Sequence, residues 1–414
     1  MWGKHSLGRR FAWLWAAYAA SALGTRLAFN AFPLIAVRVL HAGPTAVAVL
    51  AAAGAAVGAA VAVPLGPWVE FRRKRPVMIA MDLVRCAALL SIPAAFALGR
   101  LGFGQLLAVS VVVAAADITF GVAGGAYLKT LVPQEKLLAA NARFESTTWT
   151  TTILGPPLGG AAIGLLGPVT TVVADAVSYL LSALGLRAIG GREARPERDD
   201  TARLRAGDLL DGWRFLLADP ALRPLFLNTV LVNGLIMATE PLLAVLMLGP
   251  LGFAPWQYGL AFAVPCLGGL LGSRLARPLV ARYGRHRVLL TAGALRACWL
   301  PGLVLVRPGV PGLLLVMAVE LGMITCIGVF NPVYATYRLT RTAPDRVARV
   351  LSAWSVTAKA AIAVLTSVWG VLGGLTGPRT ALGLAGLLLL ATPLLLPRRE
   401  QAPEPERAAA ARGV

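Results

Sequence analysis

Charged residues are scarce in this chain. Asp, Glu, Lys and Arg make up 14% of its 414 residues, and hydrophobic residues make up 57%. Soluble globular domains contain about 25% charged residues. A chain with so few charges has too little polar surface to cover a soluble fold of this size. The composition therefore excludes an ordinary soluble protein and indicates that lipid surrounds much of the molecule.

The residue types that usually carry catalysis or bind metals are scarce as well. The chain has three histidines, at the edges of apolar stretches, and four cysteines, all inside apolar stretches and without metal-ligand spacing. It has no G-x-x-x-x-G-K loop for ATP and no plausible Ser/His/Asp set. We therefore predict no metal site, no cofactor and no enzyme activity, and we interpret the cysteines as small packing residues.

Long apolar stretches dominate the sequence. A helix needs about 20 apolar residues to cross a bilayer, and twelve stretches are long enough. A polar segment at residues 190–221 separates six from six; we expect a linker whose later part is a helix on the membrane surface. The tail at 398–414 is expected to be disordered. The predicted spans are residues 12–39, 45–69, 76–98, 103–128, 142–166, 168–189, 222–248, 256–280, 286–306, 311–337, 349–374 and 378–397.

Acidic residues are too few to balance the basic ones. The 19 Asp and Glu residues and 39 Lys and Arg residues give a net charge of +20. In a soluble protein this excess would suggest nucleic acid as a partner. Here the basic residues gather before the first span, in every second loop, in the central linker and in the tail. The positive-inside rule then places both termini and the linker in the cytoplasm, and nucleic acid is not an expected partner.

Several features recur at one offset along the chain. GPWVEFRRKRPV begins at Gly66 and resembles RPLVARYGRHRV, which begins 211 residues later at Arg277. Arg85 and Arg296, in the third and ninth predicted spans, have the same offset, as do the Pro and acidic residues after the fourth and tenth spans. Such a repeat predicts two homologous six-helix halves, an arrangement typical of transporters. The halves are an N-terminal bundle at 1–189 and a C-terminal bundle at 222–397.

The loop after the second span carries a family motif. Gly66, Glu70, Lys74 and Arg75 are similar to the G-x-x-x-D-R-x-x-R-R signature of the major facilitator superfamily, with Glu70 in place of Asp and Phe71 in place of Arg. LVPQEKLLAANA, DAVSYLLSA and ARVLSAW resemble its drug-efflux branch of macrolide-type and siderophore-type exporters. The resemblance implies an all-α membrane protein with twelve transmembrane helices in two pseudo-symmetric six-helix bundles, with alternating access to a site between them.

In that family this loop is a latch on the cytoplasmic side. A carboxylate beside a basic cluster locks two helices together, and cations at a helix C-terminus meet the negative end of its dipole. The alternative is that the cations only anchor the topology. Asp82 and Arg85 are one turn apart and are expected to be partners in the same network. The predicted cytoplasmic gate comprises Gly66, Glu70, Lys74, Arg75, Asp82, Arg85, Arg282 and Arg285.

The fifth span contains GPPLGG, which is similar to the G-P-x-x-G-G pattern of proton-coupled exporters in the superfamily. Prolines remove backbone donors and bend a helix, and glycines let another helix approach closely. Gly155, Pro156, Gly159 and Gly160 are therefore predicted helix-packing residues. Generic tight packing would also explain the motif, so it does not by itself decide for export.

Ionisable residues inside the predicted spans are functional candidates, because each costs at least about 2.5 kcal/mol at a helix centre. A low-dielectric cavity raises the proton affinity of a carboxylate. Asp117, near the middle of the fourth span, is the first candidate for proton coupling, followed by Glu240 and Glu320. Alternatively, these charges pair with one another and hold the bundle shut. In the family the first, fourth, seventh and tenth spans line the cavity, and Arg26, Asp117, Glu240 and Glu320 fall one on each.

The substrate-binding candidates are Arg26, Asn30, Trp149 and Trp354. Arg26 would bind an anionic group or neutralise Asp117. The two tryptophans would bind a flat or greasy substrate, although a Trp near a span end is more often an interface anchor.

Three other intramembrane charges are interpreted as structural. Asp175 lies in the family-typical DAVSYLLSA segment. Lys359 is expected to pair with Glu145, because their spans, the eleventh and the fifth, are repeat equivalents.

The sequence as a whole predicts a secondary active transporter, a proton-coupled exporter of a small amphipathic molecule such as a drug, a secondary metabolite or a siderophore. Two alternatives remain open: a pH-independent uniporter or lipid-type flippase of the same fold, and a transport-dead sensor subunit. The expected partners are the substrate, protons and the lipid bilayer. We expect a monomer in the inner membrane of a bacterium.

Overall fold

The computed structural model describes residues 7–28, 31–40, 50, 60, 64–65, 68–191, 193 and 206–397. Gly66, Asn30 and the tail at 398–414 lie outside the described residues. The described part is helical. Its helices are α1 (Arg9–Leu27), α2 (Ala31–Arg38), α4 (Lys74–Ala97), α5 (Phe103–Leu131), η1 (Gln134–Lys136), α6 (Leu137–Leu166), α7 (Pro168–Ala188), α8 (Ala206–Ala218), α9 (Leu222–Leu248), α10 (Pro255–Ala263), α11 (Cys266–Tyr283), α12 (Arg285–Cys298), η2 (Leu300–Leu305), α13 (Val310–Arg341), α14 (Val347–Thr376), α15 (Pro378–Ala391) and η3 (Thr392–Leu395).

Nine helical segments of the described chain are long and apolar enough to cross a membrane. The prediction of an all-α membrane protein is therefore confirmed. α1 and α6 coincide with the first and fifth predicted spans but fall outside that set of nine. Most of the second predicted span, residues 45–69, lies outside the described residues. The helix predicted in the later part of the linker is present as α8.

Two predicted spans are interrupted helices. The first is divided between α1, which ends at Leu27, and α2, which begins at Ala31. The eighth is divided between α10, which ends at Ala263, and α11, which begins at Cys266 directly after Pro265. Proline has no N–H to donate and its ring clashes with the preceding turn. Apolar length predicted one continuous helix in each case, because it does not register such breaks.

A Gly-Pro pair separates two consecutive helices in each half of the sequence. Gly167 (φ 84°) ends α6 and Pro168 begins α7, and Gly377 (φ 88°) ends α14 and Pro378 begins α15. Only glycine adopts this left-handed conformation without steric cost, and proline is already shaped for the first helical position. Within the described residues, a Gly-Pro pair thus ends one helix and begins the next at equivalent places of both halves, at nearly the offset of the repeat.

The chain divides into two compact units. Unit 1 comprises residues 1–140, 147–213 and 344–360, and unit 2 comprises residues 141–146, 214–343 and 361–414. The first part of α14 therefore belongs to unit 1, and a short stretch near the start of α6 belongs to unit 2. At these two helices the compact units differ from the two halves of the sequence.

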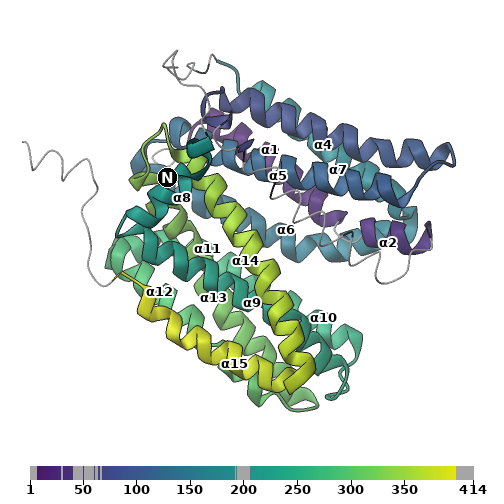
Figure 1. Ribbon diagram of the computed structural model, residues 1–414, viewed down its shortest axis with the longest axis vertical. Coiled ribbons are helices and arrows are strands. Elements are labelled where there is room, and N and C mark those ends of the chain that lie inside the picture. Colours follow the sequence, from purple (N-terminus) through teal and green to yellow (C-terminus); the bar gives the residue numbers. More distant parts are fainter. Residues whose placement is uncertain are drawn as a thin grey trace, which may run out of the picture. The chain divides into compact units, whose positions relative to one another are not determined.

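In unit 1, α4 packs against α5 and α7, and α1 packs against α7 (Figure 1). The core between these helices contains apolar side chains that are almost completely buried. Examples are Leu89 and Ile92 on α4, Leu106 on α5 and Val172 on α7. The buried charged residues Asp82 and Arg85 of α4 and Asp175 of α7 belong to the same helices.

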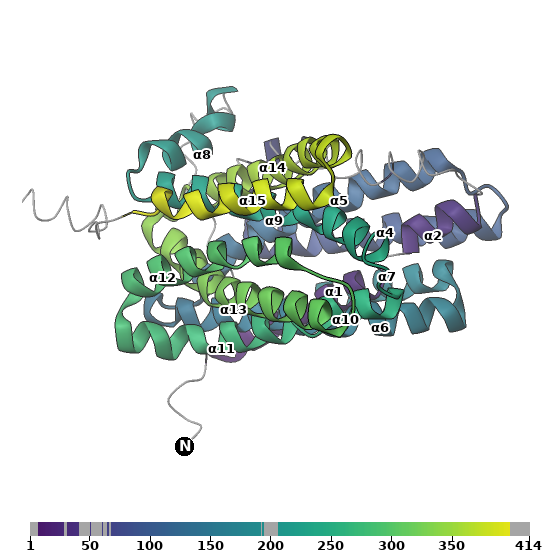
Figure 2. The same cartoon turned by 90° about the horizontal axis from the view of Figure 1, so that it is seen from below.

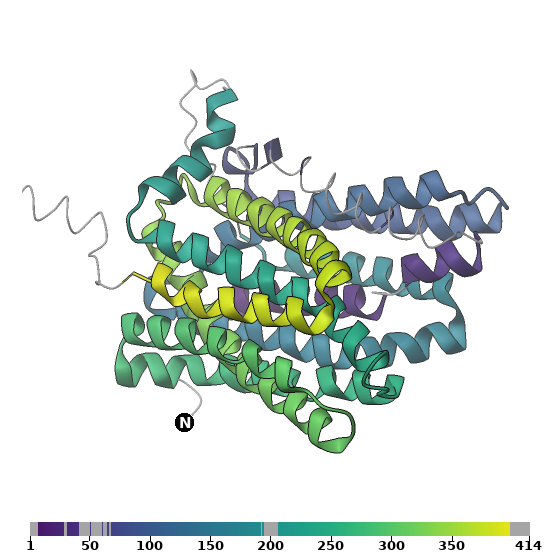
Figure 3. The same ribbon diagram turned by 60° about the horizontal axis from the view of Figure 1, so that its bottom comes forward.

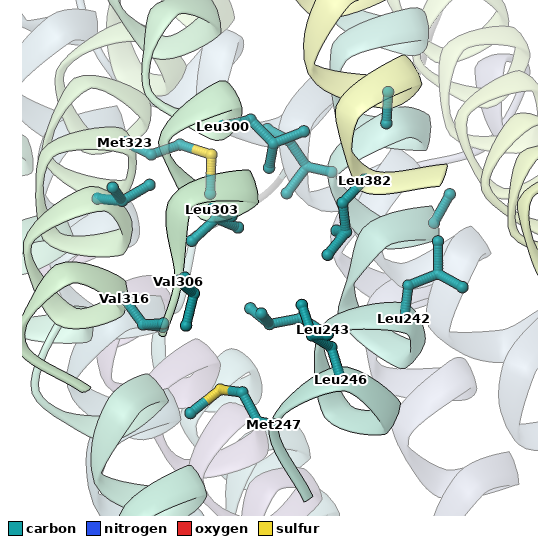
Figure 4. Packing of buried hydrophobic residues seen from close by; sticks show 14 of the residues in the cluster. Leu242, Leu243, Leu246, Met247, Leu300, Leu303, Val306, Val316, Met323 and Leu382 are labelled. Carbon is teal, nitrogen blue, oxygen red and sulfur yellow. The ribbon is translucent and has the colours of Figure 1, made fainter. Parts of the chain in front are cut away.

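In unit 2, α13 packs against α11 and α12, and α15 lies beside α9 (Figure 2). Figure 3 shows the second pair again, α9 in teal and α15 in yellow. Figure 4 shows the apolar core, where side chains from four elements point toward one another. They include Leu243 and Met247 of α9, Leu303 of η2, Val316 of α13 and Leu382 of α15.

Candidate functional site

A group of charged side chains is buried inside unit 1. Asp82 and Arg85 lie one turn apart on α4, are 0% and 1% exposed, and form an ion pair with each other. The Arg85 Nη1 atom also lies 3.3 Å from Oδ1 of Asp117 on α5. The contact expected between Asp82 and Arg85 from their spacing is thus present, and it extends to the fourth predicted span.

Asp117 lies between two cations. Its second oxygen, Oδ2, is 3.9 Å from the Nζ atom of Lys359 on α14. The Asp117 side chain is 55% exposed, so the Asp117 end of both ion pairs lies at the surface of unit 1 and not in its buried interior. Lys359 therefore pairs with Asp117, and its predicted pairing with Glu145 stays a prediction. Within the described chain the partners of Asp117 are Arg85 and Lys359, not Arg26, so its charge is already balanced.

Aromatic rings flank the Arg85 guanidinium. Its carbon lies 4.6 Å from the centre of the Phe120 ring and 4.1 Å from that of the Tyr179 ring. Cations are attracted to the faces of aromatic rings, and more strongly where water is excluded. The Tyr179 hydroxyl forms a 2.8 Å hydrogen bond with Thr25 of α1. Arg85 is therefore held in place by α4, α5 and α7 together.

Arg296, the repeat counterpart of Arg85, is buried in unit 2 without a carboxylate partner in the described chain. It is 0% exposed, donates a 2.6 Å hydrogen bond to Oδ1 of Asn228, and lies 3.6 Å from the centre of the Phe330 ring. The sequence repeat thus corresponds to a repeated burial of one arginine against an aromatic ring. The two sites differ in charge, because carboxylates surround Arg85 and an amide contacts Arg296.

Unit 2 contains a second acidic site, on α9 and α13. Glu320 is 6% exposed and Glu240 is exposed. The two carboxylates interact electrostatically with each other, and both act on the Tyr258 side chain of α10. Within the described residues, neither Glu240 nor Glu320 forms an ion pair. The described residues therefore supply no cation to balance the charge of this pair, in contrast to that of Asp117.

The predicted latch residue Glu70 forms an ion pair outside the predicted spans. Its Oε2 atom is 2.6 Å from Nε of Arg349, near the start of α14, and Arg349 is also 2.6 Å from Oδ2 of Asp211 on α8. These contacts all lie within unit 1. Burial raises the pKa of Glu70 to about 7, although the Arg349 charge opposes this shift by favouring the ionised carboxylate.

Replacing Glu70 by Gln is expected to remove a pH-dependent part of the stability. Because the pKa of Glu70 in the folded protein is about 7, above the ordinary value of 4.5, the protonated group favours the folded state below about pH 4.5. That contribution is lost as the pH rises through about 7. The free energy of unfolding falls by an amount on the order of 1 to 3 kcal/mol. Asp345, Lys74 and Arg349 are the charged groups that act on Glu70.

The measurement is the unfolding midpoint of the purified protein across this pH range. The wild type should lose stability as the pH rises, relative to Glu70→Gln. Glu135→Gln, at an exposed position of η1, is the matched control and should follow the wild type. Parallel curves for wild type and Glu70→Gln would contradict the assignment.

Lys74 and Arg75 form the first turn of α4, where a carboxylate from the linker meets them. The backbone N–H groups of Lys74 and Arg75 donate to Oε1 and Oε2 of Glu193, at 2.7 and 3.0 Å. A carboxylate at a helix N-terminus satisfies unpaired N–H groups and complements the helix dipole. The Lys74 side chain donates to the Glu70 carbonyl at 2.6 Å, and that of Arg75 to the Gly190 carbonyl at 2.6 Å.

The predicted gate residues of the second half occupy the ends of two helices in unit 2. Arg282 is exposed in the last turn of α11, and its guanidinium lies 5.3 Å from the ring centre of its neighbour Tyr283. Arg285 begins α12, with its guanidinium 5.4 Å from the Tyr337 ring centre. Both arginines therefore contact aromatic rings, and their role as a gate stays a prediction.

The GPPLGG segment lies on α6, where two of its glycines touch α1. A Cβ atom at Gly155 would overlap with the side chain of Arg26, and one at Gly159 would overlap with the backbone oxygen of Leu27. Because only a glycine fits at such a close approach, α6 and α1 are in backbone contact here. The side chain of Pro156 and the surroundings of Gly160 lie outside the described part of the structure.

The model of one protein family matches most of the chain. It is described as Major Facilitator Superfamily, and it matches residues 14–306 and 225–413. This chain belongs to the major facilitator superfamily. It is therefore a secondary transporter rather than an enzyme, a multi-pass membrane protein with a small-molecule substrate, and the predicted family is confirmed.

Relatives of this transporter include efflux pumps. The chain is 26% identical over 351 residues to the protein named Multidrug efflux pump Tap in Mycolicibacterium fortuitum, a match that covers 80% of this chain and 82% of that protein. It is 28% identical over 344 residues to the pump of the same name in Mycobacterium tuberculosis, with 80% and 78% coverage. The homology to multidrug efflux pumps is thus distant but extends over most of both chains.

Solved structures share the fold of this transporter. A bacterial homologue of the iron transporter ferroportin, in an outward-facing state, has a TM-score of 0.80 at 16% identity and covers 94% of this chain and 98% of its own. The fucose:proton symporter of E. coli has a TM-score of 0.70 at 13% identity, with 95% and 98% coverage. At these identities the likeness shows the fold alone, and it confirms the predicted major facilitator fold.

The predicted substrate-binding residues of the transporter lie on three helices of unit 1. Arg26 is half-buried near the end of α1 and has no ion-pair partner in the described chain. Trp149 on α6 and Trp354 on α14 are also half-buried. Asn30, the fourth candidate, lies outside the described residues. Substrate contact by these residues stays a prediction.

Sequence reasoning missed several residues that the structure brings to these sites. Arg349 was considered only as one of the basic loop residues, and Asp211, Glu193 and Tyr258 were not singled out. Each contacts or acts on a group far away in sequence, such as Glu193 on Lys74. No local spacing marks such partners. The sequence gives one indication of such contacts, which is that acidic residues recur in the otherwise basic linker.

Proposed function

We propose that the protein is a proton-coupled exporter of a small amphipathic molecule, which works by alternating access in a bacterial cytoplasmic membrane. Export is supported by the relatives named as multidrug efflux pumps, which are 26% and 28% identical to this chain. The distribution of basic residues supports a topology with both termini in the cytoplasm. We further propose that it acts as a monomer.

The observation that carries proton coupling is the acidic pair of unit 2. Glu320 is 6% exposed and interacts electrostatically with Glu240, and the described residues supply no cation to either. Two negative charges without a counter-ion are costly in a membrane. The pair is therefore most stable with one proton bound, and it behaves as a unit that binds and releases this proton.

Asp117 is a weaker candidate for the coupled proton than the sequence suggested. Its carboxylate already has Arg85 at 3.3 Å and Lys359 at 3.9 Å. Removing its charge would leave two cations without their partner, which favours a structural role for this group. The same observation favours the alternative function, a pH-independent uniporter or flippase, if Glu240 and Glu320 prove to be uncoupled.

The test is transport by purified protein in proteoliposomes with the membrane potential held at zero. The probes are ethidium as a lipophilic cation, fluorescein as an anion and Nile red as a neutral dye. With the lumen acidic and the cytoplasmic face outward, at least one probe should accumulate, and a protonophore should abolish the gradient. Transport that ignores the pH difference would overturn the proposal in favour of the uniporter or flippase. If no probe moves, the assignment of an amphipathic substrate is wrong.

A further inference from the structure

Asp175 on α7 is the most isolated carboxylate of the unit 1 charge group. It is 4% exposed. The Ser178 hydroxyl lies 3.3 Å from its Oδ1 atom, and no cation of the described chain lies within ion-pair distance. Gly24 of α1 covers it, since a Cβ at Gly24 would lie 2.9 Å from Oδ1 of Asp175 and would overlap with Ser178. Within the described residues, the side-chain donor beside this buried acid is thus one neutral hydroxyl, which also donates to the Asp175 backbone oxygen at 2.7 Å.

The charges around Asp175 do not sum to zero. The completely buried members of the group are Asp82, Asp175 and Arg85, at 0%, 4% and 1% exposure. Arg85 is in direct contact with Asp82 and also pairs with Asp117, whereas it acts on Asp175 only from a greater distance. Two carboxylates against one guanidinium leave one negative charge in the membrane interior, and an unpaired buried charge is strongly destabilising.

We propose that Asp175 binds a proton of its own and that this proton is transported in addition to the one at Glu240 and Glu320. The proposal rests on the proposed proton-coupled function. With Asp175 protonated, the buried group is neutral, and Asp82 and Arg85 form a balanced pair. One turnover then moves two protons, one bound in each unit of the molecule.

Release of this proton depends on Arg85. When the Asp175 carboxyl loses its proton to water, the remaining carboxylate needs a cation, and Arg85 is the nearest one that acts on it. The charged and titratable groups around the site are Arg85 and Asp82 on α4, Asp117 on α5 and Tyr179 on α7. Lys359 still balances the charge of Asp117 when the Arg85 guanidinium stabilises the Asp175 carboxylate. Asp117, at 55% exposure, is the member of the charge group that is most accessible from outside the bundle.

The experiment measures the steady-state accumulation ratio of the transported probe under a pH difference of about one unit and zero membrane potential. Each coupled proton then contributes a factor of about 10 to the ratio. Asp175→Asn, which mimics the protonated acid, should lower the ratio about tenfold while the probe still equilibrates downhill. Glu320→Gln should lower it about tenfold through the other proton, and the double variant about a hundredfold. Glu135→Gln, at an exposed surface position, should match the wild type.

Two results would overturn the inference while leaving the proposed function intact. One is an unchanged ratio in Asp175→Asn. The other is a double variant no worse than Glu320→Gln, since both residues would then act on a single proton. A wild type that ignores the pH difference would instead refute the proposed function itself.

A second measurement needs no variant to fold. Infrared spectra of wild-type protein containing aspartate labelled with ¹³C at the side-chain carboxyl should show a protonated carboxylic acid band at neutral pH that shifts with the label. Glutamate labelling should shift a different band, to which Glu70 contributes together with Glu240 and Glu320. Absence of any aspartate-sensitive acid band would contradict a protonated Asp175.

Discussion

Replacing Glu320 by Gln is expected to reduce proton-driven accumulation of the substrate about tenfold at a pH difference of about one unit. Glutamine keeps the size and shape of the protonated carboxyl but cannot release a proton. Glu320 is 6% exposed and has no ion-pair partner in the described chain, so no cation is left without its counter-charge in the variant. We therefore expect coupling to be lost while the fold and downhill movement of the substrate are retained.

The measurement is the accumulation ratio in proteoliposomes, with downhill equilibration as the control for folding. Glu240→Gln should have a similar effect, because the two carboxylates interact and are proposed to bind one proton as a pair. Asp117→Asn should differ from both, since it removes the partner of Arg85 and Lys359 and is expected to destabilise the protein. Full coupling in both glutamine variants would refute the assignment of the acidic pair.

Replacing Gly159 by Ala is expected to destabilise the protein severely. The added Cβ would overlap with the backbone oxygen of Leu27, and a backbone atom cannot move aside as the end of a flexible side chain can. Overpacking of this kind costs about 1 to 3 kcal/mol, and more where backbones are in contact. The helices α1 and α6 would have to separate, so the loss of stability should be visible as a lower unfolding temperature.

Gly164 provides a matched control on the same helix, because a Cβ there would have no neighbour within 4 Å. Gly164→Ala should therefore leave the unfolding temperature unchanged or raise it, since Ala favours a helix by about 1 kcal/mol over Gly. Gly155→Ala should behave like Gly159→Ala through its overlap with Arg26. Equal stability of Gly159→Ala and Gly164→Ala would show that α1 and α6 are not in backbone contact.

The fold could be predicted from the sequence because its causes are local or repetitive. Apolar length marks a membrane helix wherever it occurs, and the basic loops mark one side of the membrane. The loop segment that recurs 211 residues later in the chain shows the repeat directly. Arg85 and Arg296, which have the same offset, are indeed both buried against aromatic rings. What apolar length missed was the interruption of the eighth span at Pro265, since helix geometry at one residue leaves hydropathy unchanged.

The candidate site was only partly predictable, and the difference lies in sequence separation. Asp82 and Arg85 are three residues apart, so helix geometry alone brings them together. Lys359 reaches Asp117 over 242 residues, and Arg349 reaches Glu70 over 279. Such pairs depend on which helices pack and on their rotation, and neither follows from spacing along one helix.

The contact between Glu193 and the start of α4 has a consequence for how this protein can be divided. Glu193 lies beyond residue 189, where the apolar pattern placed the end of the first bundle, yet its carboxylate accepts the first two N–H groups of α4. A first half expressed as a separate polypeptide would lack this cap if it ended at residue 189 and would keep it if it ended after Glu193. The boundary for co-expressing the two halves as independent chains is therefore set by a hydrogen bond and not by hydropathy.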